Sequence, residues 1–529
     1  MYQPGRSVVA LSAVAALVAG AVAMAACTPK SSWEQSTIPE GLDVYYTQKV
    51  EWISCADDDG FSTGVPKIDE LNELDTLECA WMTVPMDYAN PSGETIEIAL
   101  GRSVAKKSKG SVVVNPGGPG SSGVELVPSL AKDAGPVLRE SLDIVGFDPR
   151  GVGRSKPPVD CVDDQGLDAY LSTDYDTSTA AGVAEAQAAA DAFAAGCLER
   201  TGPALQFVDT ISAARDMDVL RAVLGETKLT YLGFSYGTQL GATYASLFPD
   251  NVGNMVLDGA VDPTVTPNEK TLIQAGGFES ALRAYVTDCL ESDACPLSGS
   301  VDDAMAQVTA VVDAAEANPL PTGTPRPLTG SLALTGIIAP LYFKDPGWDF
   351  LTVGLEGAIT DGDGTMLLVI ADLFYNDRCN DLVCPEEDGF FSNSTEAHIA
   401  IRCADSRDEA DPETVAAINE QIMQVAPILG KYFVDEGVDS CAAWPTPVAT
   451  PLDSYDAIGA GPIVVIGTTN DPATPYEWAV TLSKNLDEGV LITYEGEGHT
   501  AYTSAGKCVQ DAVDDFLVNG KVPTNGLTC

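Results

Sequence analysis

Histidine and basic residues are scarce in this chain. Of its 529 residues two are histidine, and 28 Lys and Arg stand against 77 Asp and Glu, a formal net charge of −49. This balance excludes nucleic acid as a partner, because its phosphates need a basic surface. The acidic residues are spread along the chain, which favours a role in solubility. Attraction of cationic substrates or peptide N-termini is the second explanation.

Ligands for a metal ion or a phosphate group are also missing. Two histidines and one closely spaced cysteine pair, Cys379 and Cys384, do not make up a zinc site. The glycine-rich residues 115–123 are not followed by Gly-Lys-Ser/Thr, the sequence that holds phosphates in nucleotide-binding loops. We therefore expect neither a metal ion nor an organic cofactor.

Long hydrophobic runs are absent except at the N-terminus. Arg6 precedes an apolar run over residues 8–26, which predicts a signal peptide over residues 1–26. Met24-Ala25-Ala26 before Cys27 resembles a bacterial lipobox, so we expect a lipid on Cys27, residues 27–50 as a tether, and membrane contact through this anchor. The expected location is the cell membrane, facing the cell envelope. A plain secretory signal and an uncleaved membrane anchor are the alternatives.

The cysteine count agrees with export. The chain has 13 cysteines, and setting Cys27 aside leaves an even number that allows up to six disulfides in an oxidising compartment. The local candidate pairs are Cys161 with Cys197, Cys289 with Cys295, Cys379 with Cys384, and Cys508 with Cys529. Spacing alone leaves the full connectivity open.

The chain alternates strand-like and helix-like segments in two stretches. Strand patterns occur at residues 95–105, 111–115, 142–147, 228–233, 254–257, 462–467 and 490–494, and a helical pattern at 213–224. Residues 263–455 are typical of helical segments with proline-rich joints. We expect one α/β core, residues 51–262 and 456–529, interrupted by a helical cap, residues 263–455, that covers the mouth of a site.

A nucleophile is indicated by Gly233-Phe234-Ser235-Tyr236-Gly237, a G-x-S-x-G sequence. The string alone is common, but here an apolar strand leads into it and a helix-like segment follows. That strand–turn–helix context is the one in which a serine is exposed on a sharp elbow. The pattern predicts Ser235 as the nucleophile of a serine hydrolase, in an α/β-hydrolase fold with a large, mainly helical cap inserted before the strand that carries the catalytic Asp.

A serine hydroxyl needs a base, and the chain offers only His398 and His499. His398 lies in a predicted cap helix and is expected to be structural. His499 follows the last predicted strand in a glycine-bearing loop, and it fits the chain order Ser, acid, His of this fold. Asp471, after the apolar strand at 463–466, is the expected acid that orients the imidazole. A loop aspartate before Pro472 is the alternative for Asp471.

An oxyanion hole needs two backbone N–H donors. The expected donors are the amide of Tyr236, directly after the nucleophile, and the amide of Gly118 in the glycine-rich loop. The segment Asp148-Pro149-Arg150 to Ser155 is expected at the rim of the site, where Arg150 and Asp148 are candidates for a bracing salt bridge.

Together these motifs resemble the proline iminopeptidase and tripeptidyl aminopeptidase family of α/β-hydrolases. The resemblance rests on Gly-Gly-Pro-Gly at 117–120, on Gly-Phe-Asp-Pro-Arg-Gly-Val-Gly-Arg-Ser at 146–155, on Gly-Phe-Ser-Tyr-Gly-Thr at 233–238, and on Asp471 and His499 with a cysteine-bearing tail like that of TAP-like members. It runs from Trp52 to Cys529. The lipobox version is similar to exported actinobacterial proteases. Pro116 replaces the histidine usual in proline iminopeptidases, which favours the tripeptidyl branch.

The resemblance implies a serine peptidase that acts on peptides or proteins and releases tripeptides or short peptides from free N-termini. In that family carboxylates of the cap pair with the substrate ammonium, and the sequence does not single out which. A carboxylesterase or lipase, and a limited endoprotease of envelope proteins, share the same machinery. A catalytically dead binding protein and a transporter lipoprotein are further alternatives that the complete Ser, Asp, His set disfavours. No oligomeric state is assigned.

Overall fold

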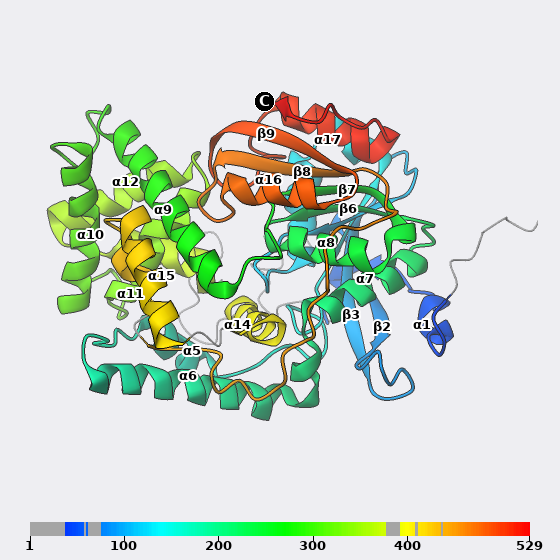
Figure 1. Ribbon diagram of the computed structural model, residues 1–529, viewed down its shortest axis with the longest axis horizontal. Helices are drawn as coiled ribbons and strands as arrows, with labels where there is room; N and C mark the ends of the chain where they lie inside the picture. The colour runs from blue at the N-terminus through cyan, green and yellow to red at the C-terminus, as the bar shows by residue number, and fades with distance from the viewer. Residues whose placement is uncertain (1–37, 58–59, 62–75, 377–391, 408–410, 435–436) are drawn as a thin grey trace, which may run out of the picture. The chain divides into compact units, whose positions relative to one another are not determined.

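The described chain is built on one β-sheet, which lies in the right half of Figure 1. The computed structural model describes residues 38–57, 60–61, 76–376, 392–407, 411–434 and 437–529. Within them, ten strands follow the order β1-β2-β3-β5-β4-β6-β7-β8-β9-β10. Their bounds are β1 Ile53–Ser54, β2 Glu78–Pro85, β3 Thr95–Ser103, β4 Ser111–Asn115, β5 Asp143–Phe147, β6 Leu229–Phe234, β7 Val252–Asp258, β8 Ile463–Asn470, β9 Gly489–Glu497 and β10 Leu527–Thr528. Neighbours from β1 through β3 to β5 pair antiparallel, and all others pair parallel.

The parallel strands are apolar on both faces because helices cover both sides of the sheet. Val113 of β4 packs in one buried cluster with residues of α7 and α8, whereas Val112 and Val114 pack in another with residues of α3 and α17. The helices of the core are α1 Asp43–Tyr46, α3 Gly123–Asp133, α4 Pro136–Ser141, α5 Asp164–Ser172, α6 Ala180–Thr201, α7 Thr210–Val223, α8 Tyr236–Leu247, α16 Tyr476–Asn485 and α17 Lys507–Asn519. The predicted strands and the α/β-hydrolase fold are confirmed.

Between β7 and β8 the described elements are helices. Thr266 caps the first of them in a capping box with Glu269, and Pro267 occupies its first turn. The helices are α9 Pro267–Cys289, α10 Val301–Ala317, α11 Gly330–Ile338, α12 Gly347–Glu356, α13 Thr365–Ala371, α14 Ser394–Asp405 and α15 Pro412–Val425. Figure 1 shows α9 to α12 and α15 gathered beside the sheet. Residues of α9 to α13 bury an apolar cluster of their own, while α14 joins the cluster of the sheet.

Short helical turns connect these elements. Their bounds are η1 Cys55–Asp57, η3 Gly202–Phe207, η4 Pro249–Asn251, η5 Ala339–Tyr342, η6 Gly357–Asp361, η7 Asp372–Asn376 and η8 Gly430–Tyr432. Of these, η5 matters for the site because its last residue, Tyr342, lies beside His499.

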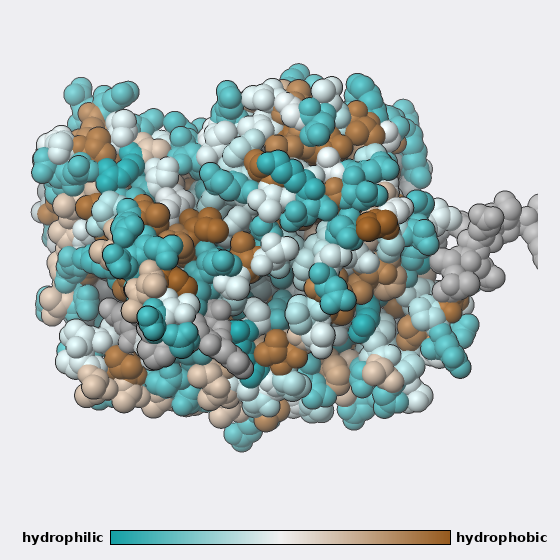
Figure 2. Space-filling view, in the orientation of Figure 1, coloured by the Kyte–Doolittle hydropathy of each residue, from teal (hydrophilic) through white to brown (hydrophobic). Residues whose placement is uncertain are grey.

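The predicted signal peptide and Cys27 lie outside the described residues. The part of the predicted tether that is described packs onto the core, where Tyr46 donates a hydrogen bond to Asp218 at 2.8 Å and Gln48 donates to the Thr83 carbonyl. No helix of the described residues is sufficiently long and apolar to cross a membrane. Figure 2 shows polar and apolar residues interspersed on the visible face.

Five disulfides join described cysteines. Three of the four predicted pairs are confirmed: Cys161–Cys197, Cys289–Cys295 and Cys508–Cys529. The fourth, Cys379 with Cys384, lies outside the described residues. Two further pairs, Cys55–Cys79 and Cys403–Cys441, were not predicted.

The prediction of a bracing salt bridge between Arg150 and Asp148 is wrong. Both Arg150 and its actual partner Asp216, on α7, are fully buried, and two 2.7 Å hydrogen bonds join them. Asp148 instead accepts hydrogen bonds from the Ser122 hydroxyl and from the amides of Val124 and Arg154. Asp216 lies 66 residues away in sequence, so no local pattern pointed to it.

Replacing Arg150 with methionine is expected to destabilise the fold, because the Asp216 carboxylate would stay buried without a counter-charge. Breaking a buried ion pair in this way costs about 3–5 kcal/mol. Thermal or urea unfolding of the full chain would measure the loss. Lys521→Met, in an exposed pair with Asp515, serves as control and should leave the midpoint unchanged. Equal midpoints for both variants would contradict the prediction.

Candidate active site

Ser235 lies on a sharp turn between β6 and α8. Its backbone has φ 55° and ψ −125°, a conformation that a non-glycine residue adopts only when its surroundings impose it. Two backbone hydrogen bonds hold the turn. The Ser235 amide donates to the Asp258 carbonyl at 2.9 Å, and the Thr238 amide donates to the Ser235 carbonyl at 2.8 Å. A side chain on Gly237 would lie 2.7 Å from the Asn115 carbonyl, so the turn requires glycine there. The predicted elbow geometry is therefore present.

Asp471 and His499 meet at the carboxyl ends of the last long strands. Asp471 follows β8, His499 follows β9, and His499 Nδ1 lies 2.9 Å from both carboxylate oxygens. The carboxylate also accepts hydrogen bonds from the amides of Ala473 and Thr474 and from the Thr474 hydroxyl. Because a carboxylate only accepts, the imidazole proton is on Nδ1 and Nε2 is left with its lone pair.

His499 Nε2 is buried and has no hydrogen-bond partner among the described residues. The imidazole lies beside the serine elbow: a methyl group on Gly259, the residue after the partner of the Ser235 amide, would lie 3.1 Å from His499 Cε1. A buried nitrogen without a hydrogen-bond partner lowers the stability of the fold, and in a native structure it often marks a catalytic group. Its position next to the elbow fits a base that takes the proton of a serine hydroxyl.

The environment of His499 adjusts its basicity. Burial alone lowers the pKa of His499, but the charge and hydrogen bond of Asp471, with a contribution from Asp258, raise it above the ordinary value. The ring of His499 is nearly perpendicular to that of Tyr342, whose ring centre is 5.3 Å away and whose carbonyl accepts the His499 amide hydrogen bond at 2.8 Å. Tyr342 thus holds His499 from the cap side.

Next to Ser235, the glycine-rich loop meets the start of α8, and two backbone amides of these segments are candidates for an oxyanion hole. The Gly117 amide is occupied by a 3.0 Å hydrogen bond to the Asn115 side chain. Among the described residues, the amides of Gly118 and Tyr236 have no hydrogen-bond partner. A methyl group on Gly117 would lie 2.9 Å from the Tyr236 nitrogen, so the glycine-rich loop and the start of α8 are in contact. The arrangement suits an oxyanion hole built from Gly118 and Tyr236.

Replacing Gly117 with alanine is expected to lower kcat/KM at least about 100-fold, the scale of losing one oxyanion donor. The new methyl group would lie 2.6 Å from the Phe234 carbonyl and would fill the space in front of the Tyr236 amide. Steady-state kinetics on a chromogenic ester would measure the loss. Gly225→Ala also places alanine at positive φ but meets no atom within 4 Å, and it should keep its activity. An active Gly117→Ala enzyme would contradict the prediction.

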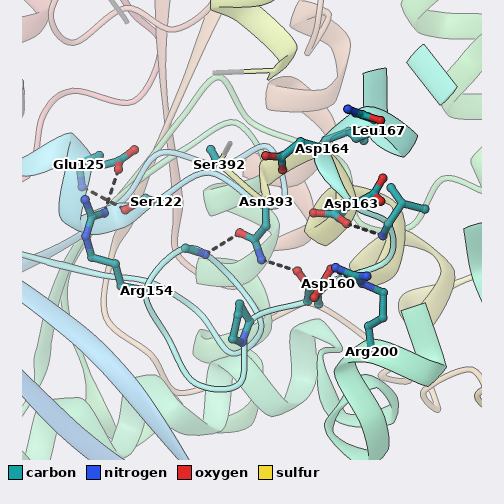
Figure 3. Close-up of a pocket in the computed structure, with 16 residues that line it drawn as sticks. Ser122, Glu125, Arg154, Asp160, Asp163, Asp164, Leu167, Arg200, Ser392 and Asn393 are labelled. Carbon is teal, nitrogen blue, oxygen red and sulfur yellow. Dashed lines mark hydrogen bonds and ion pairs between the residues drawn. The ribbon is translucent and has the colours of Figure 1, made fainter. Parts of the chain in front are cut away.

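A separate polar pocket of about 630 Å³ lies next to the glycine-rich loop (Figure 3). It lies between Ser122 at the start of α3, the loop before α5, and Asn393 and Glu396 of the α14 region. Its cations are paired with its acids, Arg154 with Glu125 and Arg200 with Asp160. None of Ser235, Asp471 and His499 is among the described residues that line it, so the pocket is distinct from the triad.

His398 lies on α14, as the sequence predicted, and it packs against the glycine-rich loop. Its Nδ1 is 3.1 Å from the Pro119 carbonyl. The contacts of Thr474 and Tyr342 with this site were not predicted from the sequence. Thr474 follows Asp471 by three residues, the spacing at which an aspartate caps a turn, so a local signal existed for it. Tyr342 carries no such signal, because its contact with His499 spans most of the cap.

Comparison with known proteins finds relatives over most of the chain. Residues 110–316 match the family described as alpha/beta hydrolase fold, and residues 426–529 match the family described as TAP-like protein. The serine protease Hip1 of Mycobacterium tuberculosis is 37% identical over 465 residues, covering 85% of this chain and 87% of that protein. Carboxylesterase B of the same species is 39% identical over 467 residues, covering 87% and 88%. Tripeptidyl aminopeptidase of Streptomyces lividans is 31% identical over 544 residues, covering 97% and 95%.

Proposed function

The chain belongs to the α/β-hydrolase family of serine hydrolases that includes the actinobacterial Hip1 protease and tripeptidyl aminopeptidases, and on that premise we propose that it is an exported peptidase. It acylates Ser235 and releases tripeptides or short peptides from free N-termini. The supporting observation is the buried, unpaired Nε2 of His499 beside the serine elbow, with Asp471 on the other ring nitrogen.

In the proposed reaction the Ser235 hydroxyl attacks the scissile carbonyl while His499 Nε2 takes its proton. The negative charge that develops on the carbonyl oxygen is stabilised by the amides of Gly118 and Tyr236. Asp471 keeps the Nδ1–H tautomer and stabilises the imidazolium without taking the proton. The imidazolium then protonates the leaving amine, and the acyl group stays on Ser235. Water, deprotonated by His499, hydrolyses this ester and restores the hydroxyl.

Export and anchoring form the second part of the proposal. A lipid on Cys27 would hold the enzyme at the outer face of the cell membrane, and five disulfides between described cysteines suit an oxidising compartment. The net charge of −49 supports attraction of peptides with a positive N-terminus. Peptides and proteins of the cell envelope are the proposed substrates.

A carboxylesterase is the second candidate, favoured by the 39% identity to carboxylesterase B. Ester and amide hydrolysis use the same acyl-enzyme and the same oxyanion hole, so the triad alone does not distinguish them. The difference lies in the leaving group: an amine must be protonated by His499 as it departs, whereas an activated alcohol leaves more readily.

The deciding experiment times the hydrolysis of one tripeptidyl chromogenic amide as the free amine and as its N-acetyl form, together with a short acyl ester of a similar chromophore. Ser235→Ala provides the blank. Cleavage of the free amine alone would support the tripeptidyl aminopeptidase. Equal cleavage of the acetylated amide would overturn the requirement for a free N-terminus and favour an endoprotease. Rapid ester hydrolysis without cleavage of either amide would favour the carboxylesterase.

A further inference from the structure

The glycine-rich loop rests directly on the first turn of α14. A methyl group added to Gly120 would lie 2.3 Å from the Ser394 carbonyl and 2.9 Å from the His398 amide nitrogen, so the two backbones are in contact. The His398 side chain reaches the same loop, with Nδ1 3.1 Å from the Pro119 carbonyl. Pro119 directly follows Gly118, the proposed oxyanion donor.

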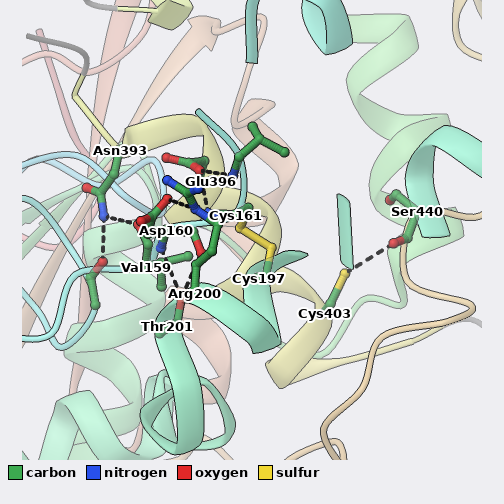
Figure 4. Close-up of a disulfide and its surroundings, with 12 residues drawn as sticks. Val159, Asp160, Cys161, Cys197, Arg200, Thr201, Asn393, Glu396, Cys403 and Ser440 are labelled. Carbon is green, nitrogen blue, oxygen red and sulfur yellow. Dashed lines mark hydrogen bonds and ion pairs between the residues drawn. A yellow bond between two sulfur atoms is a disulfide. The ribbon is translucent and has the colours of Figure 1, made fainter. Parts of the chain in front are cut away.

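Helix α14 is itself fixed to neighbouring segments at both ends. Before its first residue, Asn393 accepts from the Gly153 amide and donates to the carbonyls of Gly151 and Val159, each at 2.8 Å. In its first turn, buried Glu396 accepts from the amides of Cys161 and Val162, beside the Cys161–Cys197 disulfide (Figure 4). The Cys403–Cys441 disulfide holds its last turn. A helix fixed in this way is a rigid support for the loop it touches.

The last residue of α14 is linked to the second oxyanion donor. The Asp405 carboxylate accepts hydrogen bonds from the Thr210 amide at 2.7 Å and the Thr210 hydroxyl at 2.5 Å. The Tyr236 hydroxyl lies 2.5 Å from the same Thr210 oxygen and donates to it, since the hydroxyl proton of Thr210 is engaged by Asp405. One helix therefore contacts the loop of Gly118 and, through Thr210, the side chain of Tyr236.

The hydrogen bond to the Pro119 carbonyl determines which ring nitrogen of His398 carries the proton. A carbonyl oxygen only accepts, so His398 carries its proton on Nδ1 and donates it to Pro119. Burial lowers the pKa of His398 to about 4, and the positive charges of Arg402 and Lys270 act in the same direction. The ring is thus a neutral hydrogen-bond donor at neutral pH.

We propose that His398 is a positioning residue of the oxyanion hole, which holds the Gly118–Pro119–Gly120 loop through the Pro119 carbonyl so that the Gly118 amide faces the oxyanion. The inference rests on the proposed Ser235 centre but not on the substrate being a peptide. Loss of the donor would let the loop move, and a misplaced oxyanion donor lowers kcat more than it raises KM. The expected loss is about 10- to 100-fold, below that of deleting a donor outright.

The test compares the full chain with His398→Leu, which removes the donor, and His398→Asn, whose side-chain amide can donate from near the Nδ1 position. With p-nitrophenyl acetate as substrate, His398→Leu should lower kcat about 10- to 100-fold with KM within about twofold, and His398→Asn should recover most of the loss. The inhibition constant of phenylboronic acid, whose adduct with Ser235 places an oxygen in the oxyanion hole, should rise in parallel for His398→Leu. Equal kcat in all three enzymes, or equal losses in the two variants, would overturn the proposal.

A measurement on the parent enzyme needs no variant. With two histidines in the chain, ¹⁵N-histidine NMR resolves both rings, and His398 should show a protonated Nδ1 and an unprotonated Nε2 at pH 7. The opposite tautomer would overturn the proposal even if the variants fail to fold. The ester assay is independent of N-terminal specificity. Failure of the peptide experiment would therefore leave this inference standing, whereas an unaffected Ser235→Ala blank would remove the centre on which both depend.

Discussion

Replacement of Ser235 with alanine is expected to abolish hydrolysis of peptides and esters alike. In the proposed mechanism the variant loses the hydroxyl oxygen that forms the acyl-enzyme, and loss of the nucleophile in a serine hydrolase lowers kcat by about 10⁶-fold. Residual turnover would come from the amides of Gly118 and Tyr236 acting on an attacking water. Steady-state rates on a chromogenic amide and on p-nitrophenyl acetate, with a fluorophosphonate probe as a second readout, would measure the effect.

Ser246→Ala is the matched control for this variant. Ser246 lies on the helix that Ser235 initiates, and its buried hydroxyl has no hydrogen-bond partner among the described residues. Its removal should leave both rates and probe labelling intact. Substantial hydrolysis by Ser235→Ala, with the control equally active, would place the nucleophile elsewhere. Labelling of the parent but not of Ser235→Ala would tie the reactive hydroxyl to the elbow.

The elements that the sequence predicted well are those with a local physical signature. β4 and β8 consist of short β-branched runs buried on both faces, and such runs are typical of parallel strands. The elbow at Ser235 was predictable because the strand, the two glycines and the helix follow one another within a few residues. The contact between Asp471 and His499 was predictable because each lies just after a strand, and parallel strands bring their carboxyl ends to one edge of the sheet.

The features that escaped prediction depend on contacts between distant segments. Arg150 pairs with Asp216, which lies 66 residues away in the sequence, and Cys403 is bonded to Cys441, 38 residues away. The residues near each partner therefore gave no indication of the pairing. His398 was expected to be structural because its helix belongs to the inserted segment. Its contact with Pro119 spans 279 residues, and only the packing of α14 against the glycine-rich loop brings them together.

Asp471→Asn is expected to lower kcat by about 10⁴-fold while leaving the fold intact. One oxygen of Asp471 accepts two backbone amides, those of Ala473 and Thr474, so the asparagine oxygen should occupy that position. Its NH₂ group then faces His499 and donates to Nδ1. The imidazole proton moves to Nε2, and the base can no longer take the Ser235 proton. Kinetics at pH 7 and ¹⁵N-histidine NMR would record the loss and the tautomer together.

The pH profile separates this tautomer effect from simple loss of charge. The proposed mechanism needs neutral His499, so we expect the activity of the parent to fall as pH drops through the pKa of His499, which Asp471 raises against the effect of burial. Without that carboxylate the effect of burial dominates, so the acid limb of the residual activity should move to lower pH. Asp262→Asn, at a buried aspartate that accepts only from Thr264 in the described residues, should keep both the rate and the limb. An Asp471→Asn enzyme with an unmoved limb and near-parental kcat would show that another acid orients His499, because neither the charge nor the tautomer would then depend on Asp471.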